Sequence, residues 1–110
     1  MDLKTEKQGN ATVIRVPESQ IDIGNSVEFR DALAKASEGA EKIIVLDMKS
    51  VQHIDSSGIG VLITFLRHIQ DEGGELRLAS CGEKVLDTLK TTRLDSEIAL
   101  FDSVDEAVNA

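Results

Sequence analysis

Asp55, Ser56, Ser57 and Gly58 place one carboxylate and two hydroxyl groups together in the most reactive polar cluster of the sequence. The residues after them turn apolar at helical spacing, so the cluster lies where a helix is expected to begin. Side-chain oxygens at such a position cap a helix by accepting hydrogen bonds from its free backbone N–H groups. A serine hydroxyl can also act as a nucleophile or carry a phosphate. The cluster therefore has three interpretations: a helix cap, a catalytic site or a modification site.

A serine hydrolase is the first enzyme to consider, because its nucleophile lies on a similar strand-to-helix turn. That turn requires small glycine residues two positions before and two positions after the nucleophile. Ser57 has Asp55 and Ile59 at these positions, and Ser56 has Ile54 at the first of them. The spacing therefore argues against a hydrolase.

Other enzyme signatures are incomplete. His53 lies near the end of the preceding strand and His68 about three helical turns beyond Ser56, so neither is an obvious general base. The stretch from Gly58 to Gly60 lacks the third glycine of a dinucleotide-binding motif. The histidines and acids show no metal-ligand spacing, and Cys81 is the only cysteine. The sequence predicts a protein that is not an enzyme and that has no catalytic residue, metal or cofactor.

A phosphate on Ser56 or Ser57 would add about −1.5 to −2 charge at the positive end of the helix. Free backbone N–H groups at a helix N-terminus can accommodate such an anion. Beside Asp55 the phosphate would concentrate negative charge, which would expel a partner complementary to the neutral serine. Spacing alone favours the simpler interpretation, in which the two serines only cap the helix.

The elements that position this cluster alternate between strands and helices. Gly9 and Asn10 mark the turn of an antiparallel hairpin, and Gly73 and Gly74 end the helix that follows the cluster. The pattern predicts strands near 3–7, 11–16, 43–46, 75–80 and 98–101, short extended segments near 21–23 and just before residue 55, and helices near 26–37, 56–71, 85–93 and from 103 onward. Residues 1–110 are thus expected to form one α/β domain, a small mixed β-sheet of four to five strands flanked by α-helices.

The helix after the cluster carries two sets of apolar residues. One set follows three- and four-residue steps and should pack on the sheet: Ile59, Leu62, Ile63, Leu66 and Ile69. Val61 and Phe65 fall to the side of this stripe. They either widen the buried stripe, which is the usual role of apolar helix residues, or form a docking surface beside Ser56.

Composition limits the partners and the location. The 20 acidic and 12 basic residues leave a net charge of −8, which would repel nucleic acid. With three Phe and no Tyr or Trp, the chain also lacks aromatic side chains on which bases could stack. No signal-peptide pattern and no apolar run of about 20 residues is present. We therefore expect a cytoplasmic protein that neither binds nucleic acid nor inserts into a membrane.

The segments from Ile44 to Asp47 and from Ile54 to Leu62 resemble the signature of the STAS domain family, in particular of the bacterial anti-sigma factor antagonists. The likeness covers nearly the whole chain, and Asp-Ser-Ser-Gly is its most specific part. Further matches are Gly73-Gly74, the stretch from Val85 to Leu89, and Phe101-Asp102-Ser103 with Glu106-Ala107. The loop before Asp22 departs from the family, because the usual glycine is missing and Pro17 intrudes.

The resemblance implies a small α/β domain in which Ser56 is the phosphorylated residue. It implies a serine kinase of the histidine-kinase-like ATPase type, often itself the anti-sigma factor, which binds the unmodified protein. A PP2C-type phosphatase would reverse the modification, and ATP and metal would belong to these partners. The partner-binding residues suggested by this likeness and by the residue pattern are Asp22, Asp55, Ser57, Gly58, Val61 and Phe65. The alternative is a constitutive STAS accessory subunit of an ATP-binding lipid transporter, although the intact double serine argues against it.

Overall fold

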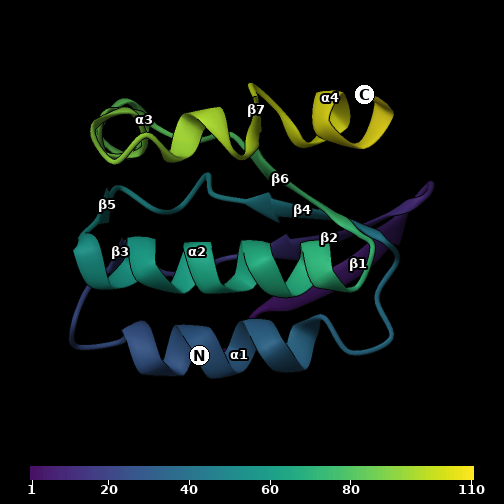
Figure 1. Cartoon of the computed structure of the whole chain (residues 1–110), viewed down its shortest axis with the longest axis horizontal. Coiled ribbons are helices and arrows are strands. Elements are labelled where there is room, and N and C mark those ends of the chain that lie inside the picture. The colour runs from purple at the N-terminus through teal and green to yellow at the C-terminus, as the bar shows by residue number, and fades with distance from the viewer.

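The computed structural model describes residues 1–110 and contains a five-stranded mixed sheet (Figure 1). The strand order is β1-β2-β4-β6-β7, with bounds of Lys4–Gln8, Ala11–Arg15, Ile43–Asp47, Glu75–Ala79 and Ala99–Phe101. β1 and β2 form the predicted antiparallel hairpin, and all later neighbours pair in parallel. The expected mixed α/β fold is confirmed.

A second sheet consists of only two short parallel strands, β3 (Gln20–Ile21) and β5 (His53–Ile54). The short strand expected before Asp55 is therefore present, but it lies outside the main sheet. Ile21 pairs with Ile54, so the residues that follow β3 and those that follow β5 leave the sheet at the same edge. This pairing brings the loop at residues 22–25 next to the serine cluster.

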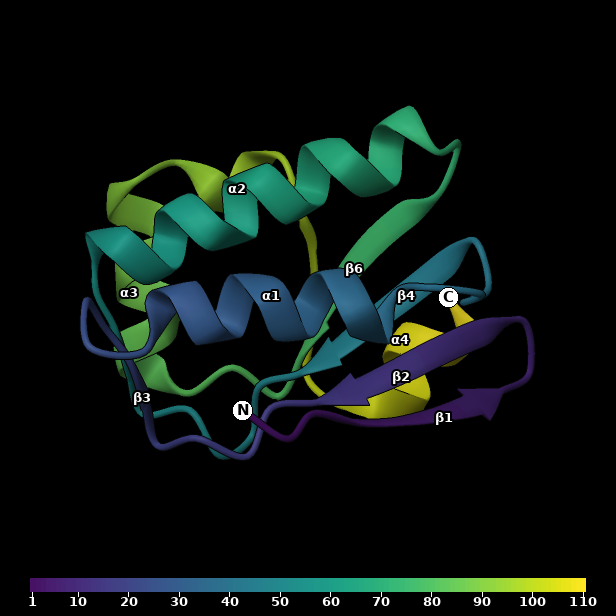
Figure 2. The same cartoon turned by 90° about the horizontal axis from the view of Figure 1, so that it is seen from below.

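Four α-helices and one 3₁₀ turn complete the fold. They are α1 (Ser26–Ala36), α2 (Ser56–Asp71), α3 (Glu83–Thr91), the 3₁₀ turn η1 (Leu94–Ser96) and α4 (Val104–Asn109). Figures 1 and 2 show α1 and α2 side by side and running in the same direction, with α3 and α4 on the far side of β4 and β2. None of these helices combines the length and the apolar composition needed to cross a lipid bilayer.

Side chains of the central strand β4 alternate between two apolar clusters. Ile44 and Leu46 join the main core, whereas Val45 joins a smaller cluster on the opposite face, where Ala107 of α4 packs. A strand covered on both faces has no polar side, which explains the near-continuous apolar run from residue 43 to 46.

The buried face of α2 is wider than the predicted stripe. Ile59, Leu62, Leu66 and Ile69 are buried as expected, but Ile63 is only partly buried. Val61 and Phe65 are 9% and 5% exposed, because α1 lies beside α2 and covers the flank that carries them. Their burial agrees with the interpretation that these two residues widen the core.

Candidate functional site

Asp55, rather than a serine, caps helix α2. Its Oδ1 accepts hydrogen bonds from the backbone N–H groups of Ser57 at 2.9 Å and Gly58 at 3.1 Å, and also from the Ser57 hydroxyl. Asp55 has an extended backbone (φ −98°, ψ −174°), which lets its carboxylate reach the first turn of the helix. The expectation that Ser56 and Ser57 provide the cap is therefore wrong, because both serines already belong to the helix.

The hydrogen bonds to Asp55 hold its carboxylate in the charged form. The bond from the Ser57 hydroxyl is the largest cause of a lowered pKa for Asp55, followed by the backbone N–H of Gly58. Desolvation acts in the opposite direction but does not prevail. A fixed negative charge therefore stands directly beside Ser56.

Ser56 and Ser57 differ in what their hydroxyl groups do. Ser57 is half-buried and its hydroxyl is committed to Asp55. Ser56 is the first residue of α2, is exposed, and makes no side-chain hydrogen bond within the chain. Neither His53 nor His68 bonds to it, so the hydroxyl has no general base. Of the two serines, Ser56 thus has the hydroxyl that is free to contact or react with another molecule.

The loop at residues 22–25 is fastened to this site. Asp22 organises the loop, since its carboxylate accepts hydrogen bonds from Gly24 N at 2.9 Å and from Gln20 Nε2 at 3.0 Å. The backbone N–H of Ile23 then donates to Asp55 Oδ2 at 3.2 Å. One carboxylate thus caps α2 with one oxygen and holds the loop with the other.

Ile23 is the feature of the site that the sequence analysis missed. Ile23 is 84% exposed, and Val27 on the first turn of α1 is 58% exposed. They are the two large hydrophobic residues that are exposed to solvent in this fold. The available signal was an isoleucine within Asp-Ile-Gly-Asn, since Asp, Gly and Asn suit a turn and an aliphatic residue does not. Ile23 lies in the loop that Asp55 holds, and Val27 lies in the first turn of the helix that follows this loop.

Gly58 has a packing role. A Cβ atom at this position would lie 2.6 Å from Ile54 Cγ1 and 2.8 Å from Ile21 Cγ2, so only glycine lets α2 approach β3 and β5 this closely.

Among the residues predicted to bind partners, Asp55 and Ser57 adjoin Ser56, and Asp22 shapes the loop that Asp55 holds. Gly58, Val61 and Phe65 are buried instead.

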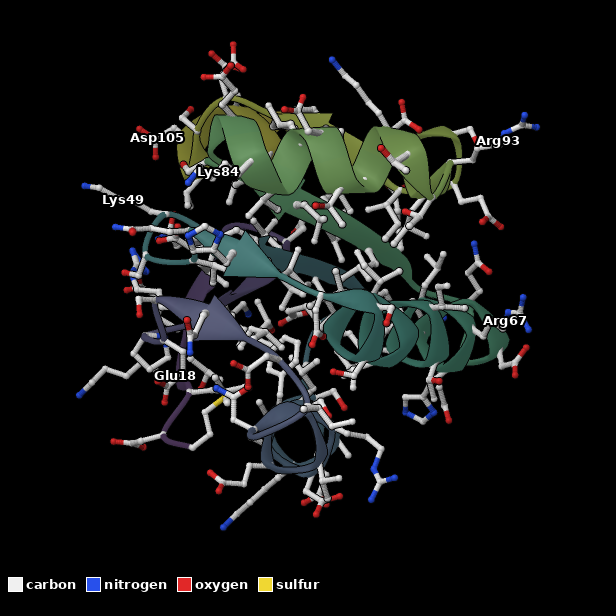
Figure 3. The ribbon with its side chains drawn as sticks, turned by 90° about the vertical axis from the view of Figure 1, so that its left-hand side faces the viewer. Glu18, Lys49, Arg67, Lys84, Arg93 and Asp105 are labelled. Atoms are coloured by element: carbon white, nitrogen blue, oxygen red, sulfur yellow. The ribbon has the colours of Figure 1, made fainter.

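Charges around this end of the molecule are mixed, despite the net charge of −8. Figure 3 shows Lys49 and Lys84 at one edge and Arg67 at the opposite edge, beyond α2. Lys49, His53 and Lys84 line an open cavity of about 320 Å³ together with Glu83. Both signs of charge therefore occur on this side of the molecule, and the cavity contains both.

The fold defines a class of small α/β proteins with a mixed sheet flanked by helices, here with an exposed serine at the start of α2. The STAS domain family model matches residues 2–107, and the chain belongs to this family. A Thermotoga maritima protein assigned by name to the anti-sigma factor antagonists is 32% identical over 98 residues, which cover 87% of this chain and 86% of the relative. The anti-sigma-B factor antagonist of Bacillus subtilis is 28% identical over 86% of each chain.

Solved structures agree with this assignment. A crystal structure of a Thermotoga maritima protein with the same designation superposes with a TM-score of 0.87 at 26% identity, covering 97% of this chain and 92% of the other. The Bacillus protein SpoIIAA, an anti-sigma factor antagonist, shares the fold at 18–19% identity, with 98% of this chain and 94–97% of SpoIIAA covered. The TM-scores are 0.77 for its unphosphorylated form and 0.70 for its phosphorylated form.

Proposed function

We propose that this protein is an anti-sigma factor antagonist-type regulator controlled by phosphorylation of Ser56. The unmodified protein binds a serine kinase of the histidine-kinase-like ATPase type and so frees the target of that kinase. Phosphorylation ends the binding, and a PP2C-type phosphatase restores it. The observation that carries the proposal is the unbonded, exposed hydroxyl of Ser56 next to Asp55, whose carboxylate holds the backbone of the exposed Ile23.

The hydrogen bonds of Asp55 explain why a phosphate on Ser56 would act as a switch. The backbone N–H groups of Ser57 and Gly58 are the donors that would otherwise neutralise an anion at this helix start. Asp55 already occupies both of them. The phosphate would therefore add its charge to that of Asp55 on the surface, where it would repel a partner fitted to the neutral serine.

The proposed docking surface consists of Ile23, Val27, Ser56 and Gly60. Ile23 and Val27 supply apolar area that a partner can bury. Gly60 is exposed, and a Cβ atom there would meet no atom within 4 Å, so its bare backbone leaves room for a close approach one helical turn from Ser56. Asp22, Asp55 and Ser57 shape this surface, whereas Val61 and Phe65 support it from the core.

The relatives support the proposal in two ways. Proteins named as anti-sigma factor antagonists are similar to this chain over most of its length. SpoIIAA has been solved with and without phosphate, and both forms superpose on this chain. The fold is thus compatible with a phosphorylated state.

The test is affinity capture from the native host with Ser56→Ala and Ser56→Asp as baits. The alanine variant should recover an ATPase-type kinase, and the aspartate variant should recover at least about tenfold less, because it places a second charge beside Asp55. Incubating that kinase with ATP and the wild-type chain should add one phosphate, which mass spectrometry should locate on Ser56.

The matched control is Ser96→Asp, which adds the same charge at an exposed serine in η1. It should behave as wild type. Equal recovery of the kinase by both Ser56 variants would contradict the proposal. Recovery of a transport ATPase by both variants would favour the constitutive accessory subunit instead.

A further inference from the structure

Helices α1 and α2 enclose a groove of about 210 Å³ on the side of α2 that faces α1. Leu33, Val61 and Phe65 form its floor, and Ala34 and Thr64 lie at its rim. Within each helix, the residues that line the groove are spaced three and four positions apart, so they lie on one face of that helix. The result is an apolar trough that opens to solvent.

Two basic side chains complete the lining, Arg30 of α1 and His68 of α2. Arg30 comes first among the α1 residues of the groove and His68 comes last among those of α2. Helices α1 and α2 run in the same direction (Figures 1 and 2). Arg30 in the first half of α1 and His68 in the last turn of α2 therefore lie toward opposite ends of the trough. A chain with a net charge of −8 thus places a basic group at each end of an apolar groove.

Arg30 retains the capacity to bind an anion. Its Nε and Nη2 lie 3.3 Å from Asp31 Oδ1, whereas its Nη1 has no partner in the chain. The pair with Asp31 is exposed, with 57% and 69% of the two side chains accessible, so solvent weakens it. A ligand carboxylate could accept from the free donors of Arg30 without breaking that pair.

We propose that the α1–α2 groove binds a small anionic amphiphile, with its saturated tail on the floor and its carboxylate at Arg30. The chemical class is that of the medium-chain fatty acids. The groove is below the range of about 300–1,000 Å³ that is typical of drug-sized ligands. Its small volume and apolar floor suit one short alkyl chain. This inference does not depend on the phosphorylation of Ser56.

The experiment is a set of ¹H–¹⁵N correlation spectra of the full chain, titrated with octanoate, octanol and octylammonium. The three probes share one tail and differ in the charge of the head group. Octanoate should give saturable shifts confined to α1 and α2, with affinity at least about tenfold higher than that of octylammonium. Hexanoate should bind roughly tenfold more weakly than octanoate, because it loses two methylene groups of apolar burial.

Substitutions separate the roles of the floor and of the charged end. Ala34→Phe fills the groove and should abolish the octanoate shifts, and Thr64→Met is a second filling variant in case the first perturbs α1. Arg30→Gln should weaken octanoate binding about fivefold to tenfold while leaving octanol binding unchanged. The matched control is Arg67→Gln, which removes an exposed charge from α2 beside His68 but outside the groove lining.

Three results would overturn the proposal. They are octanoate shifts that do not saturate or that lie outside α1 and α2, equal affinity for octanoate and octylammonium, and octanoate binding that survives both filling variants. A concentration-dependent dimer that covers the same groove residues would likewise count against a small ligand and would assign the groove to a second copy of the chain.

Discussion

Asp55 and Ile23 are joined by a hydrogen bond of 3.2 Å from the backbone N–H of Ile23 to Asp55 Oδ2. The other oxygen of the same carboxylate caps α2. One side chain therefore couples the start of the helix that carries Ser56 to the loop that carries the most exposed large hydrophobic residue of the fold. If Ser56 is phosphorylated as proposed, the added charge stands next to the carboxylate that joins both parts.

Asp55→Asn should remove a pH-dependent part of the stability. The folded-state pKa of Asp55 lies below the ordinary value of 3.8, so its carboxylate stabilises the fold at pH values above 3.8. This stabilisation is lost as the pH falls through the lowered folded-state pKa. Asparagine still caps a helix but carries no charge. Thermal unfolding midpoints should differ most between variant and wild type near neutral pH, and the difference should close under strongly acidic conditions.

Asp95→Asn is the control for this measurement, because Asp95 is an exposed carboxylate in η1 whose side chain makes no hydrogen bond. The difference in unfolding midpoint between Asp95→Asn and wild type should be the same at neutral and at acidic pH. A difference for Asp55→Asn that is the same at low and neutral pH would show that the charge of Asp55 is irrelevant to folding.

Ile23→Thr should separate binding from stability. The residue is 84% exposed, so its replacement should change the free energy of unfolding by no more than about 0.5 kcal/mol. If a partner buries this side chain, its loss should weaken binding roughly tenfold. Urea unfolding and titration calorimetry with the captured kinase measure the two quantities. Unchanged affinity would remove Ile23 from the docking surface.

Gly58→Ala and Gly60→Ala should have opposite effects on stability, although both lie in the first two turns of α2. The new methyl group at residue 58 would collide with Ile54 and Ile21, which should cost about 1–3 kcal/mol. At residue 60 the methyl group meets open space, and alanine favours the helix by about 0.8–1 kcal/mol. Chemical denaturation of the pair checks the prediction, and each variant serves as the control for the other.

Arg77→Met should loosen α4. Arg77 is 7% exposed, and its Nη1 donates to Ala107 O at 2.7 Å and to Ala110 O at 3.3 Å. Removing this donor should cost about 1–3 kcal/mol, because the carbonyl group of buried Ala107 loses its side-chain partner. Hydrogen exchange should become faster in α4 than in β4.

The salt-bridge partner of Arg77 provides the contrast. Glu75 contacts Arg77 Nε at 2.6 Å, but 53% of its side chain is exposed. Glu75→Gln should therefore cost less than about 1 kcal/mol. If Glu75→Gln were as destabilising as Arg77→Met, the ion pair rather than the backbone contacts would hold α4.

Cys81 should react slowly with iodoacetamide while the protein is folded. Burial is the main cause that raises the pKa of its thiol from 9.0 to about 11, and the charge of Asp47 contributes less. The reactive thiolate should then be about 100-fold less abundant at pH 8 than in the unfolded chain. Asp47→Asn should restore only a small part of the reactivity, whereas denaturant should restore most of it. Labelling at equal rates with and without denaturant would be inconsistent with this burial.

Local patterns were sufficient to predict most of the fold. Gly9-Asn10 marked the hairpin turn, and the positive φ of +58° at Gly9 shows why glycine suits it. Ser103 caps α4 by accepting from Glu106 N at 3.1 Å, which agrees with the helix expected from residue 103 onward. These features depend on neighbours a few residues apart, so they can be inferred before any tertiary contact is known. The same holds for Asp-Ser-Ser-Gly, whose likeness to the STAS family is confirmed by the family match.

The sequence by itself thus determined the α/β class, the family and the position of the two serines at a helix start. Asp55 is the cap, Ser57 donates to it and Ser56 keeps a free hydroxyl, through contacts only two and three residues apart. Only the tertiary structure decided that the loop carrying Ile23 joins this site, because the parallel pairing of β3 with β5 brings Ile23 to Asp55 across 32 positions of sequence. The tertiary structure also decided that Val61 and Phe65 are buried. Their exposure depends on where α1 packs, and the residue pattern of α2 does not predict that position.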